Sequence, residues 1–147
     1  MVLFIIVTIL VVILDQITKF FIESNLYNQS IDLIKNVFSF TYLENYGAAF
    51  GILSDNNWIL NVISPALIGI LIYYFMKFSN KRYEKVIGGV VGGGAIGNYI
   101  DRIFRGYVVD FIDLKIWPIF NLADICIVVG CVLLCINFIK KEKSDGN

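Results

Sequence analysis

Apolar residues fill four stretches of the chain, residues 2–22, 58–76, 86–103 and 119–139. A helix needs roughly 20 apolar residues to cross the hydrocarbon layer of a membrane. The pattern therefore predicts an all-α membrane protein with four transmembrane helices, built as a single domain over residues 1–147. The first stretch has no basic segment before it and no small-residue cleavage site, so we expect a retained helix rather than a signal peptide.

The more polar segment 23–57 contains a strand pattern. In VFSFTYLEN, residues 37–45, the aromatic side chains at 38, 40 and 42 alternate with side chains that would face the other way. We expect a small extracytoplasmic sheet between the first and second helices. Beyond it, Asn45 and Gly47 indicate a turn, and Ala48 and Ala49 would let another backbone approach closely. An ordinary loop is the alternative interpretation.

Glycine recurs every four residues in the third stretch, at Gly89, Gly93 and Gly97. This spacing places the three on one helix face, which predicts close packing of a second helix there. Residues 92–97 also satisfy G-x-G-x-x-G, but no strand precedes them, so we reject a dinucleotide site.

Composition narrows the chemistry. Hydrophobic residues make up 58% of the chain and charged residues 16%, and the net charge is zero, so nothing favours a nucleic-acid partner. Histidine is absent, which excludes a Ser-His-Asp triad, a Cys-His dyad and histidine-based metal sites. The three cysteines lie in the last apolar stretch without C-x-x-C spacing, so we interpret them as packing or lipid-facing residues. We expect no metal and no cofactor, and carboxylates remain as the catalytic candidates.

The distribution of basic residues predicts orientation. The link between the second and third stretches and the C-terminal tail are basic, whereas the first link holds only Lys35. Both termini should therefore be cytoplasmic. Trp58 and Trp117 would then lie at the outer interface. The basic residues concerned are Lys77, Lys81, Arg82, Lys85, Lys140, Lys141 and Lys143.

Charged and amide side chains gather toward the outer half of this arrangement. Asp15 would lie about 10 Å inside the outer end of the first helix, and Asp124 about 9 Å below Pro118 in the fourth. The third helix brings Asn98, Asp101 and Arg102 toward the same level. Ionisable groups within a membrane are costly, so they are expected to face the interior, pair with one another or mark a functional site.

Three charged residues favour a structural role. Asp15 and Lys19 are four residues apart, share a helix face and can neutralise each other. Asp101 lies near the C-terminal end of its helix, where the helix dipole disfavours an anion, so we expect a specific basic partner for it.

The remaining carboxylates leave alternatives open. Asp124 lies near the start of a helix, where the dipole favours an anion, so a structural cap would explain part of its presence. Asp110 and Asp113 both lie in the short link before that helix. Position in the chain alone does not choose between these two.

Five motifs together resemble lipoprotein signal peptidase, also called signal peptidase II, over essentially the whole chain. They occur in that family's order: DQITK at 15–19, NYGAAF at 45–50, GGAIGNYIDR at 93–102, VVDFID at 108–113 and FNLAD at 120–124. The resemblance implies an aspartic endopeptidase of the bacterial cytoplasmic (inner) membrane, active without a cofactor and as a monomer. Its substrates would be prolipoproteins, cut just before a cysteine that carries diacylglycerol.

The motif match also implies residue roles. Asp110 and Asp124 correspond to the catalytic pair, a choice over Asp113 that comes from the resemblance alone. The residues that line or brace the site would be Asn45, Asn98, Arg102 and Asn121, and those that support the structure would be Asp15, Lys19 and Asp101.

Two carboxylates in one site cannot both ionise cheaply, so the pair would hold one proton and activate water. Two other functions fit the same residues. In a small transporter or channel component, the carboxylates and Lys19 would line an ion path. In a membrane scaffold, the polar residues would only join helices.

Overall fold

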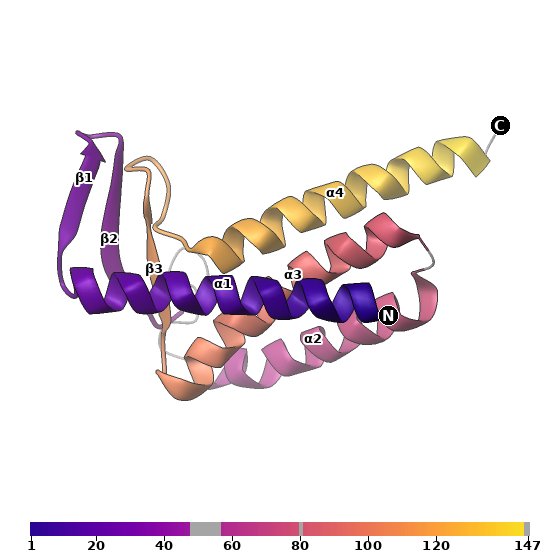
Figure 1. Cartoon of the computed structure of the whole chain (residues 1–147), viewed down its shortest axis with the longest axis horizontal. Helices are drawn as coiled ribbons and strands as arrows, with labels where there is room; N and C mark the ends of the chain where they lie inside the picture. Colours follow the sequence, from indigo (N-terminus) through magenta and orange to yellow (C-terminus); the bar gives the residue numbers. More distant parts are fainter. Residues whose placement is uncertain (48–56, 80, 146–147) are drawn as a thin grey trace.

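The structure, a computed structural model, describes residues 1–47, 57–79 and 81–145. Within these residues the helices are α1 (Val2–Leu26), α2 (Asn57–Phe78), α3 (Arg82–Phe104) and α4 (Leu122–Asp145), and the strands are β1 (Ser30–Ile34), β2 (Phe38–Asn45) and β3 (Val108–Asp113). The helices run alongside one another, and the sheet lies at the end of the bundle opposite the N-terminus and the end of α4 (Figure 1). Ala48 and Ala49 and the side chain of Trp58 lie outside the described residues.

The predicted glycine face of α3 is confirmed, and α1 packs on it. A Cβ atom added at Gly93 would lie 2.6 Å from Cβ of Val11, and one at Gly89 would lie 2.8 Å from the carbonyl oxygen of Phe4. Such distances are too short for any side chain, so glycine lets the two backbones approach closely. This contact determines which side chains of α1 lie beside which side chains of α3 along the two helices.

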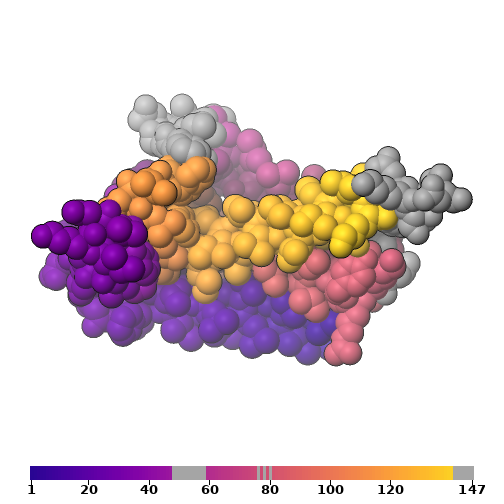
Figure 2. All heavy atoms as spheres, turned by 90° about the horizontal axis from the view of Figure 1, so that it is seen from above, coloured from indigo at the N-terminus to yellow at the C-terminus, as the bar shows by residue number. Residues whose placement is uncertain are grey.

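The helices carry apolar side chains outward and charged side chains inward. On α1, Ile9 and Ile17 are 52% and 58% exposed, whereas Asp15 and Lys19 are fully buried. By length and composition, two helical segments among the described residues can cross a membrane, Val2–Leu26 and Leu122–Lys140, and the apolar part of α2, Ile59–Phe75, is shorter. Figure 2 shows the surface of α4 exposed from its start beside the sheet as far as Lys140.

The sheet is antiparallel in the order β1-β2-β3. The strand predicted at residues 37–45 is confirmed as β2, but its alternation is broken by a register shift between Phe40 and Leu43, and both Ser39 and Tyr42 are buried. The expectation that residues 108–113 form only a link was wrong, because they pair with β2 as a third strand.

Several predicted helix ends also differ from the structure: α3 begins at Arg82 rather than 86, α4 ends at Asp145 rather than 139, and two shifts affect the level of the aspartates. Helix α1 continues to Leu26 rather than 22, which places Asp15 about 16 Å from that end instead of 10 Å. Helix α4 begins at Leu122 rather than 119, because Phe120 is still paired with Ile112 through backbone hydrogen bonds of 2.7 and 3.2 Å. Asp124 is therefore in the first turn of α4, not two turns inside it.

Candidate active site

Asp110 lies on β3 with its carboxylate turned into the protein, where it is 1% exposed. Its Oδ1 accepts a hydrogen bond from Nδ2 of Asn121 at 2.6 Å, and its Oδ2 accepts one from Nδ2 of Asn45 at 2.8 Å. Asn45 is the last residue of β2 and comes close because β2 and β3 are paired. The register of the sheet thus places an amide on each side of this carboxylate.

Asp124 lies in the first turn of α4 and forms a capping box with Asn121. The backbone N–H of Asn121 donates to Oδ2 of Asp124 at 3.1 Å, and the backbone N–H of Asp124 donates to Oδ1 of Asn121 at 3.0 Å. This reciprocal pair satisfies two free donors at the helix start, where the dipole also favours an anion. The predicted capping role of Asp124 is confirmed. It uses Oδ2 and leaves Oδ1 of Asp124 available for other contacts.

Amide side chains connect the two carboxylates. Asn98 of α3 donates through Nδ2 to Oδ1 of Asp124 at 2.8 Å, and Nδ2 of Asn121 donates to Oδ1 of Asn98 at 3.1 Å as well as to Asp110. Each carboxylate oxygen therefore accepts one hydrogen bond, three from side-chain amides and one, at Oδ2 of Asp124, from the backbone N–H of Asn121. A carboxylate offers about four acceptor positions, so both groups keep capacity for water or a substrate.

A buried cluster of charged side chains on α1 and α3 contacts the amide of Asn98. The ammonium of Lys19 lies 2.9 Å from Oδ2 of Asp15, 2.8 Å from Oδ2 of Asp101 and 2.9 Å from Oδ1 of Asn98. An ammonium has three donors and no acceptor, so all its hydrogen-bonding capacity is used. The expected pairing of Asp15 with Lys19 and the expected basic partner of Asp101 are both confirmed.

The same cluster holds the elements that carry the two carboxylates. Oδ1 of Asp15 accepts the backbone N–H of Ala123 at 3.1 Å, which ties the first turn of α4 to α1. Oδ2 of Asp101 accepts the backbone N–H of Val109 at 3.3 Å, which ties the start of β3 to α3. The residues next to Asp124 and Asp110 are therefore fixed by buried charges.

Arg102 extends from α3 beside this group. Its guanidinium donates to the carbonyl oxygens of Asn98 and Gly47, each at 3.4 Å, and lies near enough to Asp124 and Asp110 to interact with their charges. Its Nε is buried without a hydrogen-bond partner among the described residues. The site thus contains a cation with unused donor capacity.

Asp113 belongs to a different environment. Its Oδ2 lies 2.7 Å from Nζ of Lys115 and 3.3 Å from Oγ of Ser39, and Lys115 lowers the pKa of this carboxyl. The two aspartates that the sequence left undecided are therefore separated by structure: Asp110 contacts the amides around Asp124, and Asp113 forms an ion pair elsewhere.

Two contributors to the buried cluster were not among the predicted site residues. Nε2 of Gln16 donates to Oδ1 of Asp101 at 3.1 Å, and Arg105 forms an ion pair with Asp101 and with Glu23. Gln16 lies inside the DQITK motif, and Arg105 is one helical turn after Asp101. The i, i+4 spacing of Asp101 and Arg105 was a signal that could have identified this partner.

The electrostatics of the site act most strongly on Asp110. Burial raises the pKa of Asp110 to about 7, with the charge of Asp124 acting in the same direction and the amide of Asn45 opposing it. A carboxyl with this pKa exchanges protons near neutral pH, which suits acid–base chemistry. Asp110 can therefore give or take a proton near neutral pH beside the carboxyl group of Asp124.

Comparison with known proteins adds to this geometry. A family model described as signal peptidase (SPase) II matches residues 7–140. A protein of Halothermothrix orenii named lipoprotein signal peptidase is 43% identical over 139 residues, covering 94% of this chain and 96% of that protein. One of the same name from Clostridioides difficile is 42% identical over 141 residues, covering 91% and 93%.

A solved structure described as a bacterial membrane enzyme has the same fold. It matches with a TM-score of 0.89 and 35% sequence identity, over 96% of this chain and 90% of that one. A second structure of that description matches with a TM-score of 0.84 and 36% identity, over 93% and 92%.

Proposed function

This chain belongs to the signal peptidase II family, and we propose that Asp110 and Asp124 form the pair that carries out its chemistry. The chain is an aspartic protease that removes signal peptides. The observation that supports the proposed pair is the amide bridge of Asn121, which contacts Asp110 through its side chain and Asp124 through its backbone and side chain. The amides of Asn45 and Asn98 brace the two carboxylates from β2 and α3.

Hydrolysis of the peptide bond by this pair requires one proton to be shared. The ionised carboxylate takes a proton from water as the water oxygen attacks the scissile carbonyl carbon. The protonated carboxyl donates a hydrogen bond to the carbonyl oxygen and stabilises the negative charge that develops on it. When the C–N bond breaks, a proton passes from the pair to the leaving nitrogen, and the pair again holds a single proton. The guanidinium of Arg102 lies beside the two carboxylates, where it can orient the substrate backbone.

The same proposal includes a placement in the membrane. All four helices would cross the bacterial cytoplasmic membrane as one domain, with both termini in the cytoplasm and the sheet and the aspartates at the outer face. Support comes from the exposed apolar surfaces of the helices, the basic link between α2 and α3, and the position of the sheet opposite the termini (Figure 1). Water and lipid meet at that level, as the chemistry requires.

The substrate in this proposal is a prolipoprotein whose cysteine carries diacylglycerol, cut just before that cysteine. Such a substrate has an apolar signal helix and a lipid, both of which reach the site by lateral diffusion within the membrane. We propose that the enzyme acts as a monomer, as the family resemblance implies.

A reconstitution experiment tests this function. Purified protein in detergent or lipid vesicles is incubated with a diacylglyceryl-modified prolipoprotein and, as a control, with the unmodified precursor. We expect cleavage of the modified precursor without an ion gradient, a cofactor or a second protein. Absence of cleavage by folded protein, or equal cleavage of the two precursors, would contradict the proposal. A transporter component would cleave neither precursor.

A further inference from the structure

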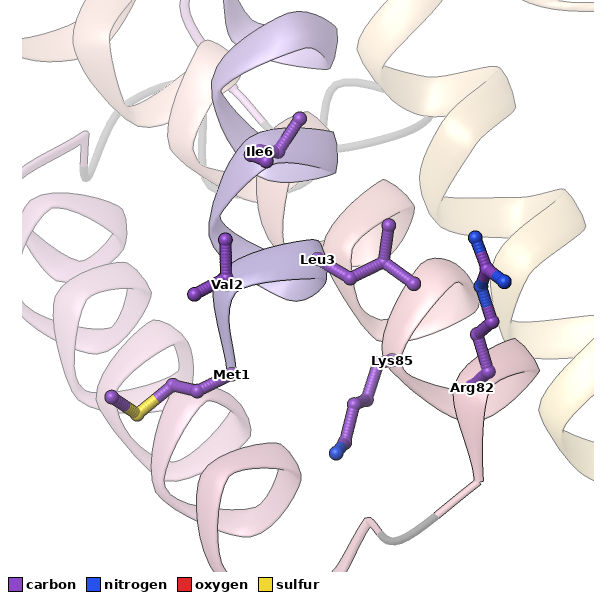
Figure 3. Close-up of a pocket in the computed structure, with 6 residues that line it drawn as sticks. All are labelled: Met1, Val2, Leu3, Ile6, Arg82 and Lys85. Atoms are coloured by element: carbon purple, nitrogen blue, oxygen red, sulfur yellow. The ribbon is translucent and has the colours of Figure 1, made fainter.

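A hollow of about 560 Å³ lies far from the aspartates, where α1 and α3 begin. Figure 3 shows the Leu3 side chain reaching from α1 toward the first turn of α3, where Arg82 and Lys85 are located. One wall is apolar and the other basic. The lining residues are Met1, Val2, Leu3, Ile6, Arg82 and Lys85.

Positive charge accumulates at this hollow. Arg82 and Lys85 lie in the first turn of α3, and basic side chains are unfavourable there because the helix dipole is already positive at that end. The acidic residue of that turn, Glu84, accepts a hydrogen bond from Ser79 at 3.3 Å. Among the side chains that the structure describes, no carboxylate forms an ion pair with Arg82 or Lys85. A bound anion would offset this excess.

The apolar wall continues onto the outer surface of α1. Val2 is 69% exposed and Ile6 is 48% exposed. Farther along α1, Ile9 and Leu10 are 52% and 53% exposed and continue this apolar surface. An anion such as free phosphate would leave this apolar wall uncovered. An anionic lipid would cover it with an acyl chain while its headgroup met the two cations.

We propose that this hollow binds a membrane phospholipid with an anionic headgroup. The phosphate accepts from the ammonium of Lys85, and Arg82, whose side chain leaves the same turn in the opposite direction (Figure 3), donates to it after turning toward the hollow. One acyl chain lies against Leu3 and Ile6. This inference rests on the proposed passage of α1 and α3 through the membrane, and it is independent of the aspartate chemistry.

The test measures lipid binding to full-length protein in detergent. Native mass spectrometry follows titration with phosphatidylglycerol, with phosphatidylcholine of the same acyl chains, and with inorganic phosphate. Phosphatidylglycerol should bind best. The variant Arg82→Gln/Lys85→Gln should bind it roughly 20- to 30-fold more weakly, since one basic side chain near an anionic headgroup contributes about fivefold.

Matched variants separate the possible causes. Lys77→Gln/Lys140→Gln removes two positive charges outside the lining residues and should retain binding, as should Asp110→Asn, which changes the proposed catalytic pair and leaves the hollow intact. Equal loss in the Lys77 and Lys140 variant would indicate general charge attraction and overturn the site. Phosphate binding as tight as that of phosphatidylglycerol would overturn the lipid assignment. If the double variant does not fold, Lys85→Gln and Arg82→Gln are measured singly, and unchanged binding in both would contradict the proposal.

Discussion

The side-chain amide of Asn121 donates a hydrogen bond of 2.6 Å to Oδ1 of Asp110. The same residue caps α4, with its Oδ1 accepting the backbone N–H of Asp124 at 3.0 Å. A single side chain thus positions one carboxylate by contact and the other by fixing the helix on which it lies. This arrangement makes the structural and the chemical contributions of Asn121 separable by mutation.

Asn121→Ser should impair activity while keeping the cap of α4. Serine is as good an N-cap as asparagine, but it lacks the amide that donates to Asp110. Serine leaves the buried oxygens of Asp110 and Asn98 without this donor, and an unpaired buried acceptor costs about 1–3 kcal/mol. We therefore expect kcat/KM to fall roughly ten- to hundredfold and the melting temperature to fall as well. Asn121→Ala is the control, and it should also lose about 1 kcal/mol of stability. Full activity of Asn121→Ser would show that the amide bridge is dispensable.

Lys19→Met should destabilise the protein strongly. The variant leaves the carboxylates of Asp15 and Asp101 buried without the ammonium that both contact, and breaking such a buried pair costs about 3–5 kcal/mol. Asp15→Leu/Lys19→Met should recover part of that loss, because Asp101 keeps Arg105 as a partner. Thermal unfolding in detergent provides the comparison. If Lys19→Met were as stable as the wild type yet inactive, a direct electrostatic role in the site would replace the structural one.

Stability should depend on pH through Asp110. The pKa of this carboxyl is 3.8 for an ordinary aspartate, as in the unfolded chain, and about 7 in the folded protein. Between these two pH values the folded state holds a proton that the unfolded chain has released. Stability contributed by this group therefore decreases as pH rises from about 4 to about 7. Asp110→Asn removes this dependence, and its melting temperature relative to wild type should rise over that interval.

Asp113→Asn is the control for this titration. Its pKa is lowered by Lys115, so its contribution is lost only as pH falls below its ordinary value. The difference between this variant and the wild type should stay nearly constant from about pH 4 to about pH 7. A constant difference for Asp110→Asn as well would mean that burial does not raise the pKa of Asp110.

The orientation of the chain is tested by labelling single cysteines in a background without the three native ones. Asp32 on β1 and Lys81 before α3 are both exposed and lie toward opposite ends of the bundle. An impermeant thiol reagent added to spheroplasts should label Asp32→Cys and leave Lys81→Cys unlabelled until the cells are opened. The reverse pattern would place the sheet and the aspartates in the cytoplasm.

Local sequence patterns predicted the features that depend on neighbours along one helix. The i, i+4 spacing of Asp15 and Lys19 predicted their ion pair, and the glycine repeat around Gly93 predicted close packing with α1. These features follow from helix periodicity, which is visible in the chain itself.

Features that depend on pairing between distant segments were missed. The third strand of the sheet forms because residues 108–113 meet residues 39–45, and no local pattern specifies that meeting. Asp110 and Asp113 are three residues apart, so they face opposite sides of a strand, and only the register against β2 decides which one faces Asp124. The amide bridge of Asn121 depends on the same register, because Phe120 pairs with Ile112 just before it.

The central claim is that Asp110 and Asp124 work as one catalytic pair, and turnover by asparagine variants tests it most directly. Cleavage of a diacylglyceryl-modified prolipoprotein is measured for Asp110→Asn, Asp124→Asn, the double variant and Asp113→Asn, with folding checked by thermal unfolding. Asparagine keeps the shape of aspartate but cannot exchange its proton. We expect each single variant at 110 or 124 to lose nearly all activity, the double variant to be little worse because the two act as a unit, and Asp113→Asn to keep most activity. Substantial turnover by Asp124→Asn, or an active Asp110→Asn beside an inactive Asp113→Asn, would contradict the claim.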